Sequence, residues 1–236
     1  MITIRSLVYT SRAAEWHALL RDLGFTQHES DGADWTVFAS SGLIAVHAVP
    51  AGDPLDGQVE LQTLVDDLDE TIAGIESLGI TVDREILDDG ATPLARVHAD
   101  NGVRVSVLPG AVKTGGSVVV QPIWYRRSAP EGQALLTALG LQPRLASDAG
   151  TWLDFSAGAG GRAALHEGDS PAIELSLEVG QPETFAAQLH DRGRPATVVD
   201  EAYNRTMLVP SPDGGDLWVN GPIDDLYGYH RLDVAE

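Results

Sequence analysis

Residues 59–79, VELQTLVDDLDETIAGIESLG, join an apolar, strand-like run to an amphipathic helical pattern that ends on a glycine. Residues 173–193, IELSLEVGQPETFAAQLHDRG, repeat that order in the second half of the chain. Each segment carries a glutamate, Glu60 or Glu174, at the second position of its strand, where acidic side chains are uncommon. The matched segments indicate that one architecture is used twice.

The same order of elements opens two further units, at residues 2–25 and 118–141. In each unit a helical segment with one apolar stripe ends near a glycine, as in RDLGF and TALGL, because glycine readily adopts the left-handed conformation past a helix end. Three short strands separated by turn residues follow each helix. The sequence therefore predicts an α+β fold of four tandem βαβββ units.

These units divide the chain into two halves. Residues 1–110 hold the first two units, and residues 118–220 hold the other two. Residues 111–117 lie in the glycine-rich segment GAVKTGGS, which has no periodicity, and are predicted to be a linker. Residues 221–236 match no unit and are predicted to be a C-terminal tail.

Composition and charge limit the classes of partner. The chain is 43% hydrophobic and 21% charged, which is typical of a globular protein, and no apolar run is long enough to span a membrane. A net charge of −20 opposes binding to nucleic acid. The chain has no cysteine, which excludes disulfides and thiolate metal sites. Together with a strand-like N-terminus that lacks a signal-peptide core, this favours the cytoplasm. We expect a monomer or a homodimer.

The tandem βαβββ pattern, with its LGF-type helix ends and the VDDLD segment, resembles the vicinal oxygen chelate superfamily. That group includes glyoxalase I, extradiol dioxygenases, fosfomycin-modifying enzymes and bleomycin-resistance proteins. The resemblance covers residues 1–220 and implies that paired units curl into two cup-shaped, glyoxalase-like domains with ligands inside. It does not choose a reaction, because the superfamily supports several chemistries on one scaffold.

The resemblance also implies four positions around each cup where the enzymes hold a divalent metal through His or Glu. The matching residues are Arg5, Ala45, Glu60 and Ser106 in the first half and Gln121, Ala164, Glu174 and Val219 in the second. His47, His166 and Trp218 lie one or two residues from such positions on the last strands. One carboxylate per cup does not supply the several converging ligands that such a site needs. We therefore predict no metal and no other cofactor, and keep a divalent metal only for the alternative function.

Strand alternation suggests what the two glutamates do instead. If their face lines the cup, Glu60 is predicted to pair with Arg5 on the neighbouring strand and to hold the sheet together. Glu174 faces the neutral Gln121 at the equivalent place. An unpaired acid in a concave site attracts a cation, so the second cup is predicted to hold the main ligand site.

Aromatic residues support that choice. Trp124, Trp152 and Trp218 fall on three strands of the second predicted cup, whereas the first cup offers Trp35. Flat rings bind planar or cationic ligands through stacking and cation–π contact, although burial in the core explains any single tryptophan equally well. His47 and His166 occupy equivalent strand ends and remain candidates, but a histidine there is usually solvated or bonded to backbone.

These features favour a metal-free protein that binds a small molecule, either a cationic or aromatic antibiotic or a metabolite. The alternative is a divalent-metal-dependent lyase or dioxygenase of the same superfamily, so the sequence leaves open whether the chain is an enzyme. A third hypothesis is a scaffold protein whose cups are filled by its own side chains.

Overall fold

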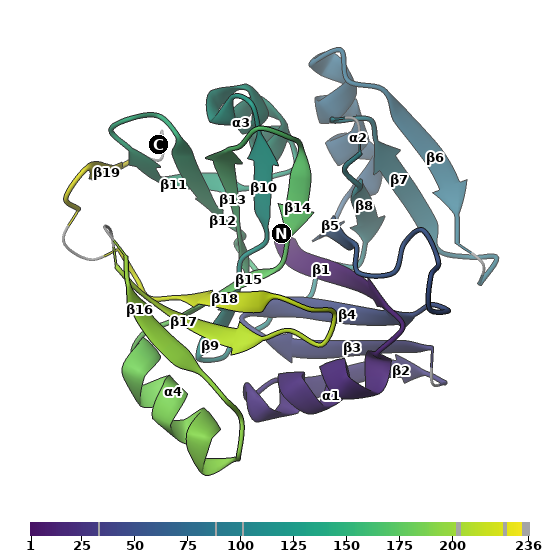
Figure 1. Cartoon of the computed structure of the whole chain (residues 1–236). Coiled ribbons are helices and arrows are strands. Elements are labelled where there is room, and N and C mark those ends of the chain that lie inside the picture. The colour runs from purple at the N-terminus through teal and green to yellow at the C-terminus, as the bar shows by residue number, and fades with distance from the viewer. Residues whose placement is uncertain (33, 88, 101, 202–203, 224–225, 233–236) are drawn as a thin grey trace.

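The predicted order, one strand, one helix and then three strands, occurs four times in the structure, a computed structural model (Figure 1). In the third and fourth units the first strand is broken into two short strands. The structure describes residues 1–32, 34–87, 89–100, 102–201, 204–223 and 226–232. The first half contains β1 (Ile2–Thr10), α1 (Ala13–Asp22), β2 (Thr26–Asp31), β3 (Trp35–Ser40), β4 (Gly42–Ala48), β5 (Val59–Val65), α2 (Leu68–Ser77), β6 (Val82–Ile86), β7 (Pro93–Val97) and β8 (Val105–Pro109). The second half contains β9 (Val118–Val120), β10 (Ile123–Arg126), α3 (Ala129–Ala138), β11 (Gln142–Ser147), β12 (Trp152–Ser156), β13 (Arg162–Glu167), β14 (Ala172–Glu174), β15 (Ser176–Val179), α4 (Pro182–Asp191), β16 (Thr197–Asp200), β17 (Arg205–Pro210), β18 (Asp216–Asn220) and β19 (Tyr229–Arg231).

The helices begin and end where local chemistry requires. Asp67 caps α2, since its side chain accepts a hydrogen bond from the backbone N–H of Glu70 at 2.9 Å. A glycine with φ between 75° and 95° follows each of the four described helices, which confirms the predicted helix ends at Gly24, Gly79, Gly140 and Gly193. None of the described helices has the length and apolar character needed to cross a membrane.

The units pair within each half. In the first half β1 and β5 pair antiparallel and join two units into one sheet, with the strand order β2-β3-β4-β1-β5-β8-β7-β6. The second half repeats these pairings, but its two central strands are broken, at Gln121–Pro122 and at Leu175. Proline has no backbone N–H and interrupts a central strand. The result is two sheets, one of β14-β10-β13-β12-β11-β19 and one of β16-β17-β18-β15-β9.

Each sheet has a face packed on the helices and a face turned away from them. We call the second face of the first-half sheet, which carries Tyr9, Glu60 and Gln62, the first cup. The second cup is the corresponding face of the second half, which carries Tyr125, Asp154 and Glu178. Much of the first cup is filled by its own buried apolar side chains, namely Leu7, Val37, Leu43, Ala45, Leu64, Leu94 and Leu108.

The two halves meet through equivalent backbone positions. The N–H of Ile4 donates to the carbonyl of Gly160 at 3.0 Å, and the N–H of Val120 donates to the carbonyl of Ser41 at 2.8 Å. Gly42 and Gly161 lie against each other beside these bonds, because a Cβ on Gly42 would come within 3.0 Å of the Gly161 Cα. The halves are therefore related by an approximate two-fold arrangement.

Two segments outside the units are more ordered than the sequence predicts. In the predicted linker, the hydroxyl of Thr114 accepts from the N–H of Gly42 at 2.8 Å and donates to the carbonyl of Ala159 at 3.2 Å, so this segment is bonded to both halves. The predicted tail contains β19, which pairs antiparallel with β11 and extends a sheet edge. Three residues of strand carry too little pattern to be recognised without that partner edge.

Candidate functional site

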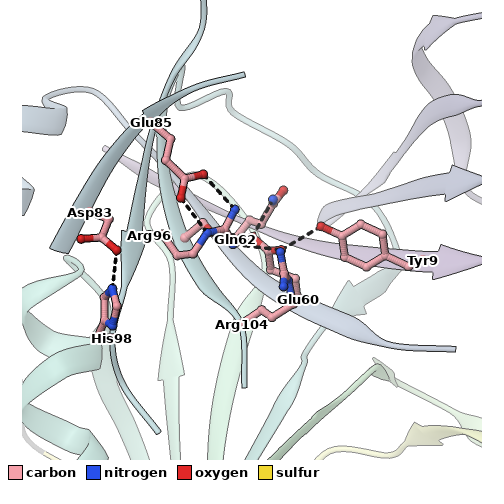
Figure 2. A network of polar contacts seen from close by, with 9 residues as sticks. Tyr9, Glu60, Gln62, Asp83, Glu85, Arg96, His98 and Arg104 are labelled. Carbon is pink, nitrogen blue, oxygen red and sulfur yellow. Dashed lines mark hydrogen bonds and ion pairs between the residues drawn. The ribbon is translucent and has the colours of Figure 1, made fainter. Parts of the chain in front are cut away.

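A network of polar side chains surrounds Glu60 in the first cup (Figure 2). Glu60 is only 1% exposed, and its carboxylate accepts hydrogen bonds from the hydroxyls of Tyr9 at 2.9 Å and Ser106 at 2.5 Å. Arg104 Nε lies 3.2 Å and Arg96 Nη1 3.8 Å from the same carboxylate. Two guanidinium groups and two hydroxyls therefore compensate the buried charge.

This network holds fixed protonation states near neutral pH. Burial by itself raises the pKa of Glu60, but hydrogen bonds from Ser106, Gln62 and Tyr9 outweigh it and lower the pKa below its ordinary value. Burial and the charge of Glu60 raise the pKa of Tyr9 to about 12, so the phenol keeps its proton. These groups are suited to holding the sheet together rather than to moving protons.

Arg5 reaches Glu60 through Gln62, which differs from the predicted direct pair. Arg5 Nε donates to Gln62 Oε1 at 2.7 Å, and Gln62 Nε2 donates to Glu60 Oε1 at 3.1 Å. The cause is the strand register, which sets Gln62 opposite Arg5 and Glu60 opposite Leu7. The Arg5 guanidinium lies over Trp35, 5.4 Å from the ring centroid, and burial lowers the pKa of Arg5 to about 10.

The same row of three rings occurs in both cups. In the first cup His47 lies between Tyr9 and Trp35, with ring centroids 5.5 Å and 5.8 Å away. In the second cup the row is formed by Tyr125, His166 and Trp152, where the distances from His166 are 5.4 Å and 5.7 Å. The strand pairings match as well, because Trp35 lies opposite His47 and Trp152 lies opposite His166.

The second row lines a cavity of about 210 Å³ in the second cup. The predicted residues Trp152, His166 and Trp218 are among its lining residues. The complete lining consists of Gln121, Ile123, Tyr125, Arg144, Trp152, Asp154, His166, Glu178, Asn204, Trp218, Asn220, Gly221, Ile223 and Tyr229. Four aromatic side chains besides His166 line the cavity, those of Tyr125, Trp152, Trp218 and Tyr229, and such rings can stack on a flat molecule.

Ion pairs lie on one wall of this cavity. Asp154 is 1% exposed and accepts from Arg144 Nε at 2.7 Å and from Gln121 Nε2 at 3.2 Å. Glu178 forms an ion pair with Arg162 and lies 3.9 Å from Arg144. Burial raises the pKa of Glu178 above its ordinary value, although the two arginines oppose that shift.

Two of the site residues predicted for the second cup lie outside the cavity. Trp124 is 1% exposed and belongs to the apolar core, because its neighbours Ile123 and Tyr125 are the ones that face the cup. Glu174 is exposed and lines an adjoining hollow of about 320 Å³ together with Asp213 and Asp216. The expected convergence of Trp124, Trp152, Glu174 and Trp218 therefore reduces to Trp152 and Trp218.

Sequence reasoning missed Arg144, Asp154, Glu178, Tyr125 and Tyr229 as cavity residues. Alternation from Trp152 would have placed Asp154 on the same face. Tyr125 repeats the position of Tyr9, because the two tyrosines lie opposite His166 and His47 in equivalent parallel pairs. Arg144 lies at a bulge in β11, where the alternation shifts. Tyr229 comes from β19 and gives no signal in the sequence.

The side chains present do not fit a divalent metal. Arg5 occupies one expected ligand position with a cation, and Val219 belongs to the apolar core at another. Among the described residues, no group of three or more His, Cys, Asp or Glu is close enough to hold an ion. In the second cup two amide side chains are already hydrogen-bonded, because Gln121 Nε2 donates to Asp154 Oδ2 at 3.2 Å and Asn220 Nδ2 donates to Ser176 Oγ at 2.9 Å.

Three solved structures of similar fold are named as a glyoxalase and two dioxygenases. A Mn(II)-bound glyoxalase from Novosphingobium aromaticivorans superposes with a TM-score of 0.66 at 13% identity, covering 98% of this chain and 83% of that one. A 2,2',3-trihydroxybiphenyl 1,2-dioxygenase from Sphingomonas wittichii gives 0.62 at 12% identity, covering 93% and 89%. A catechol 2,3-dioxygenase gives 0.61 at 15% identity, covering 99% and 95%.

These similarities confirm the expected fold, that of the vicinal oxygen chelate superfamily. No family model matches the sequence, and no curated protein sequence matches it. At such low identity, a shared fold does not transfer a reaction or a metal.

Proposed function

We propose that this protein binds a small planar aromatic molecule in the second cup, without a metal. The observation that carries this is the cavity of about 210 Å³ with Trp152, Trp218 and Tyr125 on its walls. An apolar cavity of about 150 Å³ accommodates benzene, and sites for drug-sized ligands span about 300–1,000 Å³. The volume therefore favours a metabolite of one or two rings over a large antibiotic. We place this binding in the cytoplasm, in keeping with a chain that lacks cysteine.

The first cup supports this choice by contrast. Its centre holds the Glu60 network and buried apolar side chains, which leaves little reason to place a ligand there. The hypothesis of a scaffold filled by its own side chains thus describes the first cup better than the second.

Removing either cavity tryptophan is expected to weaken ligand binding. Trp152→Ala and Trp218→Ala should each weaken affinity for one-ring aromatics about tenfold or more, because a lost stacking partner costs about 1.4 kcal/mol or more when its buried area is included. Affinity is measured by calorimetry with a panel such as indole, benzamide and catechol. Trp35→Ala alters the equivalent position in the first cup and should leave affinity unchanged. Equal affinity in all three variants would contradict the proposed site.

The alternative remains a divalent-metal-dependent lyase or dioxygenase, because two of the similar solved structures are named as a Mn(II)-bound glyoxalase and a dioxygenase. Its test is metal analysis of the purified protein together with titration of Mn²⁺, Fe²⁺, Ni²⁺ and Zn²⁺. Stoichiometric binding that Asp154→Asn or Glu178→Gln abolishes would replace the metal-free proposal with the alternative.

A further inference from the structure

The two rows of rings differ in whether a cationic side chain of the protein lies on the tryptophan. In the first cup the Arg5 guanidinium lies on Trp35, 5.4 Å from its centroid, with Arg5 only 8% exposed. The residue four positions before Tyr9 is Arg5, and the residue four positions before Tyr125 is Gln121. In the described part of the chain, no arginine or lysine stacks on Trp152 in this way.

The equivalence of Arg5 and Gln121 rests on strand pairing as well as on spacing. Gln62 lies opposite Arg5 in the first half, and the N–H of Gln121 donates to the carbonyl of Ser176 at 2.9 Å in the second. Ser176 and Gln62 both stand two residues after the matched glutamates. The shorter Gln121 side chain turns to Asp154 instead, with Nε2 at 3.2 Å from Oδ2.

Around Gln121 the second cup has acidic side chains where the first cup has apolar ones around Arg5. Val37 and Asp154 are equivalent, because each lies two residues after the tryptophan of its row and opposite an alanine, Ala45 or Ala164. Glu178 likewise stands where the first half has Leu64, four residues after the matched glutamate. Asp154 and Glu178 already form ion pairs with Arg144 and Arg162. Their carboxylate oxygens can still accept hydrogen bonds from a ligand, but neither carboxylate is an unpaired charge.

We propose that the ligand presents a planar cation, a guanidinium or amidinium group, to the face of Trp152. The cation would lie on Trp152 as the Arg5 guanidinium lies on Trp35, so the stacking of Arg5 on Trp35 in the first cup is the model for this contact. This inference rests on the proposed function and specifies its ligand class. The cation stacks on the indole, and its edge N–H groups donate to the amide oxygen of Gln121 and to the carboxylates behind it.

The test compares benzamidine with benzamide, which have the same shape and differ in charge. Benzamidine is expected to bind the wild-type protein at least tenfold more tightly at pH 7, as measured by calorimetry and by thermal shift. Equal or weaker binding of benzamidine, with benzamide or another neutral aromatic still bound, overturns this inference and leaves the proposed function standing. If no aromatic of the panel binds, both fail.

A second experiment supplies the cation from the chain itself. Gln121→Arg is expected to place a guanidinium on Trp152 and to weaken benzamidine binding at least tenfold while the protein stays folded by circular dichroism. Gln121→Met, of similar length but without charge, should lose much less affinity. A folded Gln121→Arg variant that binds benzamidine as tightly as the wild type overturns the inference. The wild-type comparison decides the matter even where this variant fails to fold.

Discussion

Replacing Gly161 with alanine is expected to lower the free energy of unfolding by about 3 kcal/mol or more. Gly161 has φ +86°, a conformation that costs a residue with a side chain about 1–3 kcal/mol. The added Cβ would also lie 2.6 Å from the Ile4 Cβ and 3.3 Å from the Gly42 Cα. Neither neighbour is the flexible end of a side chain, so the two halves must separate locally. Urea unfolding followed by circular dichroism measures the loss.

A matched control separates backbone strain from close approach. Gly150 has φ +74°, but a Cβ there would meet nothing within 4 Å. Gly150→Ala is therefore expected to lose only the conformational term, about 1 kcal/mol. Gly42→Ala should behave like Gly161→Ala, because its Cβ would come within 2.9 Å of the Val120 Cβ in the equivalent contact. Equal losses at Gly150 and Gly161 would show that the contact between the halves contributes nothing.

Glu60→Gln is expected to destabilise the protein by about 2–4 kcal/mol at pH 7. The substitution leaves Arg5, Arg96 and Arg104 around a neutral amide that cannot replace the carboxylate. The loss is placed below the full cost of breaking a buried pair, because Arg96 and Arg104 are 29% and 33% exposed and regain some hydration. The free energy of unfolding from urea titration measures it.

Glu85→Gln provides the control for this variant. Glu85 pairs with the same Arg96, at 3.2 Å, but its side chain is 44% exposed. Its loss is expected to stay within about 0.5 kcal/mol, as for other surface pairs. A similar loss in both variants would show that the buried position of Glu60 does not matter.

The contribution of Glu60 is expected to disappear in acid. Its pKa in the folded protein lies below the value of 4.5 expected for an unfolded chain, so the unfolded state binds a proton first as the pH falls. The stabilisation is complete above about pH 4.5 and is lost as the pH falls through the folded pKa. The difference in stability between wild type and Glu60→Gln should therefore be constant from pH 6 to 8 and should shrink below pH 4.5. A difference that grows in acid would contradict the lowered pKa.

Strand alternation identified much of the second cup, but it did not show for every strand which of its two faces points into the cup. Trp152 and Trp218 line the cavity as expected, whereas Trp124 faces the core and Tyr125 faces the cavity. Alternation states which residues share a face, and only packing against the helices decides which face is which. On β10 two neighbouring aromatic residues fitted either phase equally well.

Local sequence patterns alone predict the order of the elements, the four helix ends and the repetition of Glu60 as Glu174. These follow from local properties, namely side-chain periodicity and the freedom of glycine past a helix. Tertiary contacts bury Glu60 among arginines while Glu174 stays exposed, and they bring Arg144 and Tyr229 to the second cup. The neighbours responsible come from strands far away in the sequence, such as β8 in the first half and β19 in the second. Burial and charge compensation depend on those distant partners, and a repeated motif does not carry its surroundings with it.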